Sequence, residues 1–200
     1  MNKVRIAVLV SGGGTNLQAL IDAQSAGIIS SGNISLVISN NRNAYALERA
    51  AKANIATEIV VRKDCAGQDD FEQRIKDVLK KHNIDLIVLA GFLSILSENF
   101  TKDYPQRILN VHPSLIPSFC GKGYYGLRVH EEALKYGVKV TGATVHFVNE
   151  IPDGGEIILQ KSVDILDDDT PETLQHRVME QAEWKILPAA VEIVSRGLLE

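Results

Sequence analysis

Four runs in the first 90 residues have the apolar pattern of β-strands. Val4–Val10 and Asp85–Ala90 are apolar almost throughout, which is typical of strands buried on both faces of a parallel sheet. Asn33–Ser39 predicts a further strand, and Ala56–Val61 predicts one of mixed polarity. Because a strand with two apolar faces needs cover on both sides, we expect the mixed strand, Ala56–Val61, toward an edge of the sheet.

Between these runs the apolar positions follow helical spacing. A helix is expected to begin at Leu17–Ile21, an alanine-rich helix at Tyr45–Asn54, and an amphipathic one at Asp69–His82. A fifth strand follows at Ile108–Val111. Four strand–helix units in the first 110 residues predict a mostly parallel sheet with right-handed crossovers and helices on both faces.

The C-terminal half changes pattern. After a short helix expected at His130–Tyr136, Val138–Asn149 alternates like an exposed-edge or antiparallel strand, and Glu156–Ile165 is expected to pair with it. Pro171 suits a first helical turn, and a long helix is predicted over Glu172–Ser195. The predicted fold class is therefore α/β, a Rossmann-like, mostly parallel sheet with an antiparallel C-terminal strand pair.

Composition narrows the class of protein. The chain has 200 residues, which favours a single domain over 1–200, and a net charge of −4, which gives no general attraction to nucleic acid or to an anionic membrane. The N-terminus resembles neither a signal peptide nor a membrane span. Cys65 and Cys120 lack the spacing of metal ligands, so we expect no metal, reduced thiols and a cytoplasmic location.

A glycine-rich turn, Ser11–Asn16, connects the first strand to the first helix. Bare backbone N–H groups beside a helix N-terminus form a typical phosphate site, and a Walker lysine is absent from this turn. The hydroxyl of Thr15 and the amide of Asn16 suit a terminal phosphate monoester better than a buried pyrophosphate. The alternative is a tight turn in which Thr15 or Asn16 simply caps the helix.

Asn110 and His112 lie two residues apart at the end of the fifth strand, so their side chains are expected on the same side. Pro113 and Pro117 then end regular pairing. An amide can donate to a developing oxyanion, and an imidazole can move protons near neutral pH. The alternative is a buried strand that carries an ordinary core histidine.

Two other segments contribute candidates. Leu93–Leu96 is an apolar loop that follows a strand, where it either lines a ligand cleft or packs in the core. Asp153 lies in a Pro-Asp-Gly-Gly turn and is by itself most simply a turn former. Taken with Asn110 and His112, this carboxylate completes a trio suited to direct acyl transfer to an amine, because no Ser or Cys nucleophile accompanies it.

The remaining histidines carry less weight at this stage. His82 and His176 are expected to be solvated, His130 to be structural, and His146 to support the trio from the strand that leads to Asp153.

Five separated segments and a C-terminal one, Glu183–Pro188, carry a family resemblance over essentially the whole chain. The five are Val8–Leu20 (VLVSGGGTNLQAL), Val37–Asn41 (VISNN), Ile87–Leu96 (IVLAGFLSIL), Ile108–Pro117 (ILNVHPSLIP) and Thr141–Gln160 (TGATVHFVNEIPDGGEIILQ). With these segments in this order the sequence resembles the glycinamide ribonucleotide formyltransferases of purine biosynthesis and their formyltransferase fold.

The resemblance implies a role for each matching position. It implies that Asn110, His112 and Asp153 are catalytic and that Gly14, Thr15 and Asn16 hold the substrate phosphate. It places Gly91, Pro113 and Glu183 beside the ribonucleotide, and Arg107 behind the site. For the folate 10-formyltetrahydrofolate, it implies Asn110 and a cleft of Leu93, Ser94, Ile95, Leu96, Val148, Asn149, Glu150, Ile151, Pro152 and Asp153. Residues 1–110 would then hold mainly the ribonucleotide, and residues 85–165 the folate and the catalytic groups.

The sequence also departs from the family's pattern. The family often has arginine where Ser94 and Gln68 stand, so the folate's glutamate tail would be held differently, with Arg62, Lys63 and Lys122 as candidates. One extra residue precedes Glu183, which affects its register in the last helix. The loop Cys120–Leu127 is longer than in some relatives.

The implied activity is formyl transfer from 10-formyltetrahydrofolate to the amine of N1-(5-phospho-D-ribosyl)glycinamide, with small-molecule substrates, no nucleic acid or membrane partner, and a monomer or homodimer. A methionyl-tRNA formyltransferase, which shares an Asn-x-His-Pro-Ser stretch, would be expected to carry an additional basic domain. A 10-formyltetrahydrofolate hydrolase has no need of a phosphate loop. A non-catalytic phosphate-binding module would leave the trio unexplained.

Overall fold

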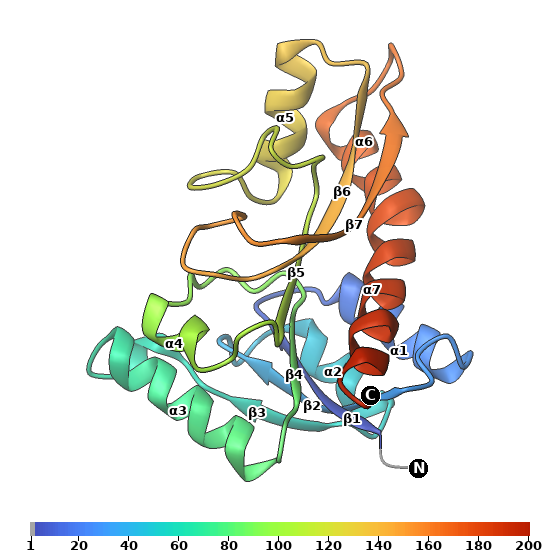
Figure 1. Cartoon of the computed structure of the whole chain (residues 1–200). Coiled ribbons are helices and arrows are strands. Elements are labelled where there is room, and N and C mark those ends of the chain that lie inside the picture. The colour runs from blue at the N-terminus through green and yellow to red at the C-terminus, as the bar shows by residue number, and fades with distance from the viewer. Residues whose placement is uncertain (1–2) are drawn as a thin grey trace.

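The computed structural model describes residues 3–200, and its seven strands form one sheet in the order β3-β2-β1-β4-β5-β6-β7 (Figure 1). The first five strands are parallel, and the last two are antiparallel to their neighbours. The strands are β1 Val4–Val10, β2 Gly32–Ser39, β3 Ala56–Ile59, β4 Leu86–Leu89, β5 Ile108–His112, β6 Val140–Phe147 and β7 Ile157–Asp164.

Helices connect the parallel strands, and further helices follow the last strand of the sheet. None of the helices in residues 3–200 combines the length and the apolar composition that a membrane crossing requires. The helices are α1 Thr15–Ser25, α2 Tyr45–Lys52, the 3-10 turn η1 Arg62–Asp64, α3 Gln68–Lys81, α4 Glu98–Lys102, α5 Leu127–Tyr136, α6 Pro171–Val178, the π-helical turn η2 Met179–Glu183 and α7 Trp184–Gly197.

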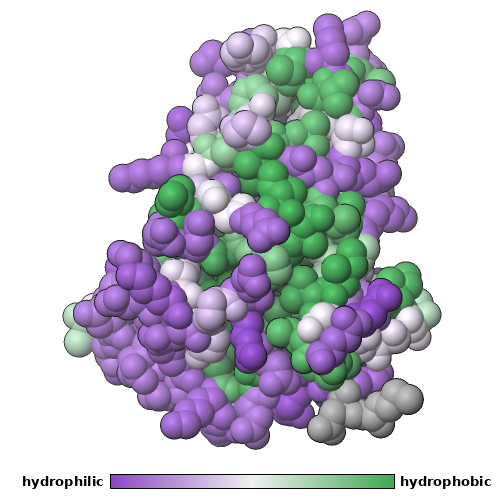
Figure 2. Space-filling model, viewed as in Figure 1, coloured by the Kyte–Doolittle hydropathy of each residue, from purple (hydrophilic) through white to green (hydrophobic). Residues whose placement is uncertain are grey.

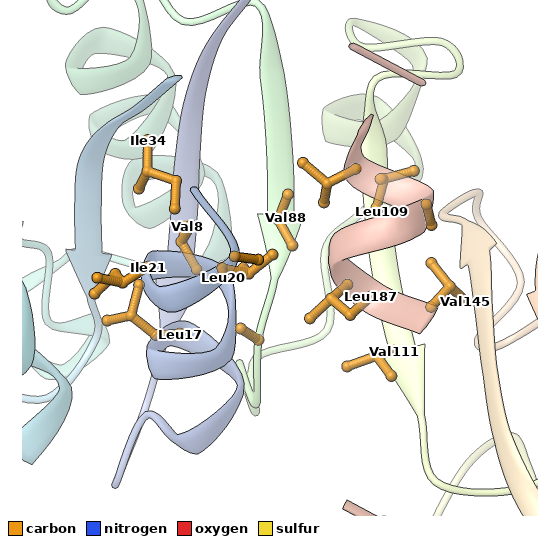
Figure 3. Packing of buried hydrophobic residues seen from close by; sticks show 14 of the residues in the cluster. Val8, Leu17, Leu20, Ile21, Ile34, Val88, Leu109, Val111, Val145 and Leu187 are labelled. Atoms are coloured by element: carbon orange, nitrogen blue, oxygen red, sulfur yellow. The ribbon is translucent and has the colours of Figure 1, made fainter. Parts of the chain in front are cut away.

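The continuous apolar run of β1 is explained by cover on both faces. Ile6, Val8 and Val10 face a core cluster that includes α1 and α7, and the alternate residues Ala7 and Leu9 face a second cluster. Figure 3 shows the first cluster, in which α1 side chains lie against Val8 and Leu187 of α7 lies near β5 and β6. Burial of both faces removes apolar surface from water throughout the strand, which is the main stabilising contribution to such a sheet.

The second cluster lies under α3 and α4. Phe71, Ile75 and Leu79 of α3 and Phe100 of α4 are all buried against the sheet. The outer side of this region is hydrophilic, whereas a hydrophobic band covers the region of α7 and the neighbouring strands (Figure 2). The stripe predicted for Asp69–His82 therefore packs as its spacing indicates.

The structure confirms the predicted fold class and the edge position of β3. Two expectations need correction. The strand β6 is antiparallel but lies between β5 and β7 and is largely buried, so it is not an exposed edge. The expected helix Glu172–Ser195 is divided by the π-helical turn, and the short helix α4 was not predicted.

Candidate active site

A cavity of about 580 Å³ lies beyond the carboxyl ends of β4 and β5, where an open parallel sheet commonly binds ligands. It reaches from Asn16 on α1 to Asn149 after β6, and so spans segments far apart in sequence. Of the residues predicted for the site, it is lined by Asn16, Gly91, Leu93, Ser94, Ile95, Leu96, Asn110, His112, Pro113, Val148, Asn149, Glu150, Pro152, Asp153 and Glu183. Gly14, Thr15 and Ile151 lie outside this lining.

Asn110 and His112 project to the same side of β5, as predicted. Leu109, before Asn110, and Val111, between Asn110 and His112, face the first core cluster. The two polar side chains therefore lie on the other side of the strand. The antiparallel register places His146 of β6 directly opposite Asn110, and Asn110 Nδ2 lies 3.3 Å from His146 Nε2. His146 Nδ1 lies 2.7 Å from the Phe147 carbonyl, which can only accept. In a neutral His146 ring, Nε2 therefore accepts from Asn110 and fixes its amide.

Asp153 reaches the same point from the turn after β6. Its backbone is left-handed, with φ of 56°, which Asp tolerates better than most residues. A Cβ on Gly155 would lie 1.8 Å from the Phe147 carbonyl, so only glycine lets this turn lie so close to β6. The Asp153 carboxylate oxygens lie 3.6 Å from His112 Nδ1 and 3.6 Å from His146 Nε2. The structure therefore places two histidines beside this carboxylate, of which His146 was expected to support the trio from its strand.

Main-chain groups of the loop after Pro117 also contact the trio, which sequence reasoning missed. His112 Nε2 donates to the Phe119 carbonyl at 2.8 Å, and the Gly121 N–H donates to Asp153 at 2.8 Å. The loop therefore occupies one hydrogen-bonding position of His112 and one of Asp153. Side-chain type carries no signal for such contacts, since only backbone atoms of Phe119 and Gly121 make them.

Burial and charge set the protonation of the trio. Burial lowers the pKa of His112, opposed by the Asp153 carboxylate and the Phe119 carbonyl, so the neutral ring predominates at pH 7. Burial alone would raise the pKa of Asp153, but the nearby His146 ring, the charge of His112 and the Gly121 N–H together lower it. The site thus pairs an ionised carboxylate with an imidazole that gains a proton readily when negative charge develops nearby.

The glycine-rich turn differs from the capping alternative. The residue before α1 is Gly14 in a left-handed conformation, with φ of 71°, and no side chain caps the helix in the described part of the chain. A Cβ on Gly14 would lie 2.6 Å from the Cβ of Ala46, which explains glycine at this position. The alternative in which Thr15 or Asn16 caps the helix is therefore excluded, and the first N–H groups of α1 stay available to a ligand.

Asn16 and Glu183 join the N-terminus of α1 to the C-terminal helices. Asn16 Nδ2 donates to the Glu183 carboxylate at 2.7 Å, whereas Asn16 Oδ1 is buried with no hydrogen-bond partner in residues 3–200. Burial raises the pKa of Glu183 to about 7, against the hydrogen bond from Asn16, which lowers it. Thr15 is outside the cavity lining, and its hydroxyl lies 3.8 Å from Sδ of Met179, which lines the cavity. The unpartnered Asn16 oxygen and the Glu183 carboxyl, which is partly protonated near neutral pH, indicate that a polar ligand binds here.

The π-helical turn Met179–Glu183 explains how Glu183 reaches Asn16. A π turn contains one more residue than an α turn between hydrogen-bonded groups, and such turns are frequent at functional sites. The π-helical turn lies between α6 and α7 and ends at Glu183. Glu183 keeps its place in the cavity lining.

The part of the cavity formed by Leu93–Leu96 is mainly apolar. Leu93 and Ile95 are 67% and 63% exposed, and Leu96 is buried, so this loop both lines the cavity and packs in the core. Ser94 accepts from Asn40 at 3.0 Å. Gln68 donates to Glu72 and, at 3.1 Å, to the Ile95 carbonyl. Neither Ser94 nor Gln68 is therefore directed outward in the way that an arginine for the folate tail would be.

Of the Lys and Arg side chains proposed from the sequence to contact the substrates, one lines the cavity and the others lie outside it. Lys122 is the only Lys or Arg among the lining residues in the described part of the chain. Arg62 and Lys63 lie in η1, outside the lining. Arg107 is exposed at the amino end of β5, whereas the site is at the carboxyl end, so its expected position behind the site is wrong.

Two further histidines have simple surroundings. His176 is exposed on α6 beside Glu180, as expected, whereas His82 is half-buried and lies 3.2 Å from Glu58. Residues 3–200 contain no group of three or more His, Cys, Asp or Glu side chains arranged to hold a metal ion.

Comparison with known proteins gives the family. The family model described as formyl transferase matches residues 4–191. The chain belongs to the formyl transferase family. This formyltransferase is 43% identical to the phosphoribosylglycinamide formyltransferase of Haemophilus influenzae over 195 residues, which cover 98% of the chain and 89% of that protein.

Longer relatives and solved structures agree with this assignment. The formyltransferase is 45% identical over 198 residues to the human trifunctional purine biosynthetic protein adenosine-3, covering 99% of the chain but only 19% of that protein. It thus spans about a fifth of the trifunctional relatives. The glycinamide ribonucleotide transformylase 1 of Symbiobacterium toebii superposes with a TM-score of 0.91 at 39% identity, covering 98% and 89% of the two chains. The formyltransferase fold implied by the sequence is confirmed.

Proposed function

We propose that this formyltransferase transfers the formyl group of 10-formyltetrahydrofolate to the amine of N1-(5-phospho-D-ribosyl)glycinamide, a step of purine biosynthesis. The observation that carries the proposal is the position of Asn110, His112 and Asp153 midway along one cavity, between the polar Asn16–Glu183 end and the apolar Leu93–Leu96 end. The names of the relatives at 43% identity and of the superposing structures support the same reaction.

We assign the Asn16–Glu183 end to the ribonucleotide. The uncapped N-terminus of α1 offers N–H groups and a positive dipole end to a phosphate, as expected for Gly14, Thr15 and Asn16. Asn16 Oδ1 and Glu183 then accept from hydroxyl groups of the sugar, which supplies the missing partner of the buried amide oxygen. Gly91 and Pro113 border the path from this end to His112.

We assign the apolar end to the folate. Leu93, Ile95 and Leu96 present a wall for a flat aromatic ring system, and the segment 148–153 offers main-chain groups along the opposite side. Residues 1–110 then supply mainly the ribonucleotide site, and 85–165 the folate and catalytic groups, within one domain. Both cysteines are free thiols, in keeping with the reducing cytoplasm, where we place the reaction.

The first chemical step is attack of the glycinamide nitrogen lone pair on the formyl carbon. The C=O π electrons move to the formyl oxygen, which becomes an oxyanion in a tetrahedral intermediate. Asn110 is held by His146 and donates to this oxygen, and His112 donates once it is protonated beside Asp153. Such fixed donors stabilise the developing charge without reorganisation of solvent.

The intermediate then collapses toward products. The amine nitrogen loses a proton, N10 of the folate gains one, and the bond between the formyl carbon and N10 breaks as C=O re-forms. The products are the formylated glycinamide ribonucleotide and tetrahydrofolate. Asp153, ionised and directed at the same point, carries the proton between the two nitrogens by way of a bound water.

The loop contacts require one rearrangement. His112 Nε2 donates to Phe119 and Nδ1 faces Asp153, so one of these contacts must open before His112 reaches the oxyanion. Small displacement of Phe119 and Gly121 when substrates enter achieves this, since only two backbone hydrogen bonds connect them to the trio.

A coupled test separates this function from its alternatives. Purified protein is mixed with glycinamide ribonucleotide and 10-formyltetrahydrofolate, and the folate absorbance is followed, with each substrate omitted in turn. We expect turnover only when both are present. Turnover without the ribonucleotide would indicate a hydrolase, formylation of methionyl-tRNA instead would indicate the tRNA enzyme, and phosphate binding without turnover would indicate a binding module.

A further inference from the structure

His130 is a buried imidazole with no hydrogen-bond partner. It lies in the first half of α5, is 0% exposed and lines the cavity. Neither Nδ1 nor Nε2 has a partner in residues 3–200. His112 and His146, by contrast, have a polar group near each ring nitrogen. A folded protein seldom retains such a group without a use, because its lost hydration is not replaced.

The protonation of His130 defines what it can offer. Burial, reinforced by the nearby charge of His112, lowers the pKa of His130 to about 4, so the ring is neutral at physiological pH. A neutral imidazole has one N–H donor and one acceptor nitrogen. It therefore suits an uncharged hydroxyl or amide group, and it lacks the charge that a phosphate or a carboxylate would favour.

The position of His130 favours the ribonucleotide over the folate. The helix α5 packs against α6, and the lining near this pair includes Gln175 of α6 and Met179 of the π-helical turn. That turn also carries Glu183. The apolar wall Leu93–Leu96 comes from the segment after β4, which belongs to the other end of the cavity.

We propose that His130 is a positioning residue for the ribonucleotide, whose buried and unpartnered ring hydrogen-bonds to an uncharged hydroxyl or amide group of that substrate. The proposal rests on the proposed function, since it takes the ribonucleotide as the ligand of this end. The bond forms only in the complex, so the free protein carries an unsatisfied group that the substrate completes.

The test uses His130→Phe, which keeps the ring's approximate shape and removes both polar atoms, and His130→Asn, which keeps a donor and an acceptor. We expect His130→Phe to melt at the same temperature as the wild type or higher, because no native hydrogen bond is lost. We expect its KM for glycinamide ribonucleotide to rise at least about tenfold, with the KM for the folate unchanged. His130→Asn is expected to recover part of the loss.

His82→Phe serves as a matched control, because it removes an imidazole with a partner, Glu58, far from the cavity lining. Its KM values should equal those of the wild type. An unchanged KM for the ribonucleotide in both His130 variants, or a rise confined to the folate, would overturn the proposal. If His130→Phe does not fold, the KM of His130→Asn and the imidazole nitrogen spectrum of wild-type protein decide.

In that spectrum, glycinamide ribonucleotide alone should shift both His130 nitrogen signals, and 10-formyltetrahydrofolate alone should leave them in place. Absence of a shift contradicts the role of His130. Failure of the proposed function gives a different result, because wild-type protein would then show no turnover with the two substrates. Turnover by wild type with unaffected His130 variants would refute this inference alone.

Discussion

The two ends of the cavity are built in opposite ways. At the end assigned to the ribonucleotide, buried side chains from distant segments meet, and several polar atoms have no partner: Asn16 Oδ1 and both nitrogens of His130 within residues 3–200. At the end assigned to the folate, Ser94 and the Gln68 amide N–H groups are hydrogen-bonded within the protein, and large apolar side chains are exposed. Gln68 Oε1 is buried without a partner in residues 3–200, but Gln68 lies outside the cavity lining. Within residues 3–200, the ribonucleotide end therefore presents unpartnered buried polar atoms to the cavity, whereas the folate end presents mainly exposed apolar side chains to it.

This difference teaches how each substrate is selected. A buried polar group without a partner discriminates strongly between ligands. A ligand that leaves this group unpaired binds more weakly, because the cost of desolvating the group is not recovered by a hydrogen bond. An exposed apolar wall discriminates by area and shape, and each lost contact costs less. We therefore expect substitutions at the ribonucleotide end to have large and specific effects, and those at the folate end to have smaller ones.

The largest effect is expected where the two ends meet. Asn110→Ala removes the amide that donates to the oxyanion, and a donor of this kind contributes about 3–4 kcal/mol to the transition state. We expect turnover to fall at least about a hundredfold, with KM changed little for either substrate. Initial rates with each substrate varied in turn will measure this.

His112→Ala should behave in the same way, and circular dichroism should show both variants folded. Near-normal turnover in either variant would exclude that residue from the reaction centre. A rise in KM for one substrate alone would instead place the residue at one end of the cavity.

The next effect concerns Glu183 at the ribonucleotide end and appears in stability. Its pKa is about 7 in the folded chain and near 4.5 when unfolded. Below pH 4.5 both states hold the proton. Between pH 4.5 and 7 only the unfolded chain releases it, so the folded state loses about 3 kcal/mol as pH rises through this window, and nothing further above pH 7.

Glu183→Gln removes this dependence, because an amide does not ionise. Urea titrations at pH 5 and pH 7.5 should show the variant gaining about 2 kcal/mol relative to wild type over that interval. The same variant should raise KM for the ribonucleotide and leave the folate unaffected. Parallel pH profiles for wild type and variant would show that Glu183 does not hold its proton at pH 6.

Much of the fold and of the reaction centre can be predicted from the sequence, because the relevant signals lie within short segments of the chain. The alternation around Asn110 and His112 places both side chains on one side of β5, and strand pattern alone is enough to predict that. The apolar run of β1 predicts burial on both faces in the same way. The glycines at 14 and 155 signal close approach, although the contacts with Ala46 and Phe147 appear only in the fold.

What escaped prediction depends on backbone atoms or on a change of helical register. The Phe119 and Gly121 contacts involve only main chain, so residue type gives no sign of them. The π-helical turn contains one more residue per turn than an α-helix, and this changes the direction in which the Glu183 side chain points. His130 was expected to be structural, because its lack of partners is a property of the folded surroundings rather than of the motif.

A smaller effect is expected from Asp153→Asn. Asparagine tolerates the left-handed backbone of this position, so the turn should be retained, and only the charge is lost. Since Asp153 raises the pKa of His112, its loss should lower that pKa further. Turnover at pH 7 should then fall about tenfold, because fewer molecules carry protonated His112.

The pH–rate profile provides the check on Asp153. Its basic limb should move to lower pH in Asp153→Asn, and activity should recover partly on acidification. A uniform loss at every pH would mean that the carboxylate acts on proton transfer alone and does not charge His112.

The smallest effect is expected at the folate end, from Lys122. It is the one Lys or Arg of the cavity lining in residues 3–200, and it is exposed on a loop, so its attraction to the folate's carboxylates is weakened by solvent. Lys122→Ala should raise KM for a polyglutamylated folate about threefold, and less for the monoglutamate. Arg62→Ala, outside the lining, is the matched control and should change neither value. The effect should shrink at high salt, as expected for an exposed ion pair. An effect as large as that of Glu183→Gln on the ribonucleotide would contradict the contrast between the two ends, because it would show that the folate end, too, depends on a single desolvated side chain.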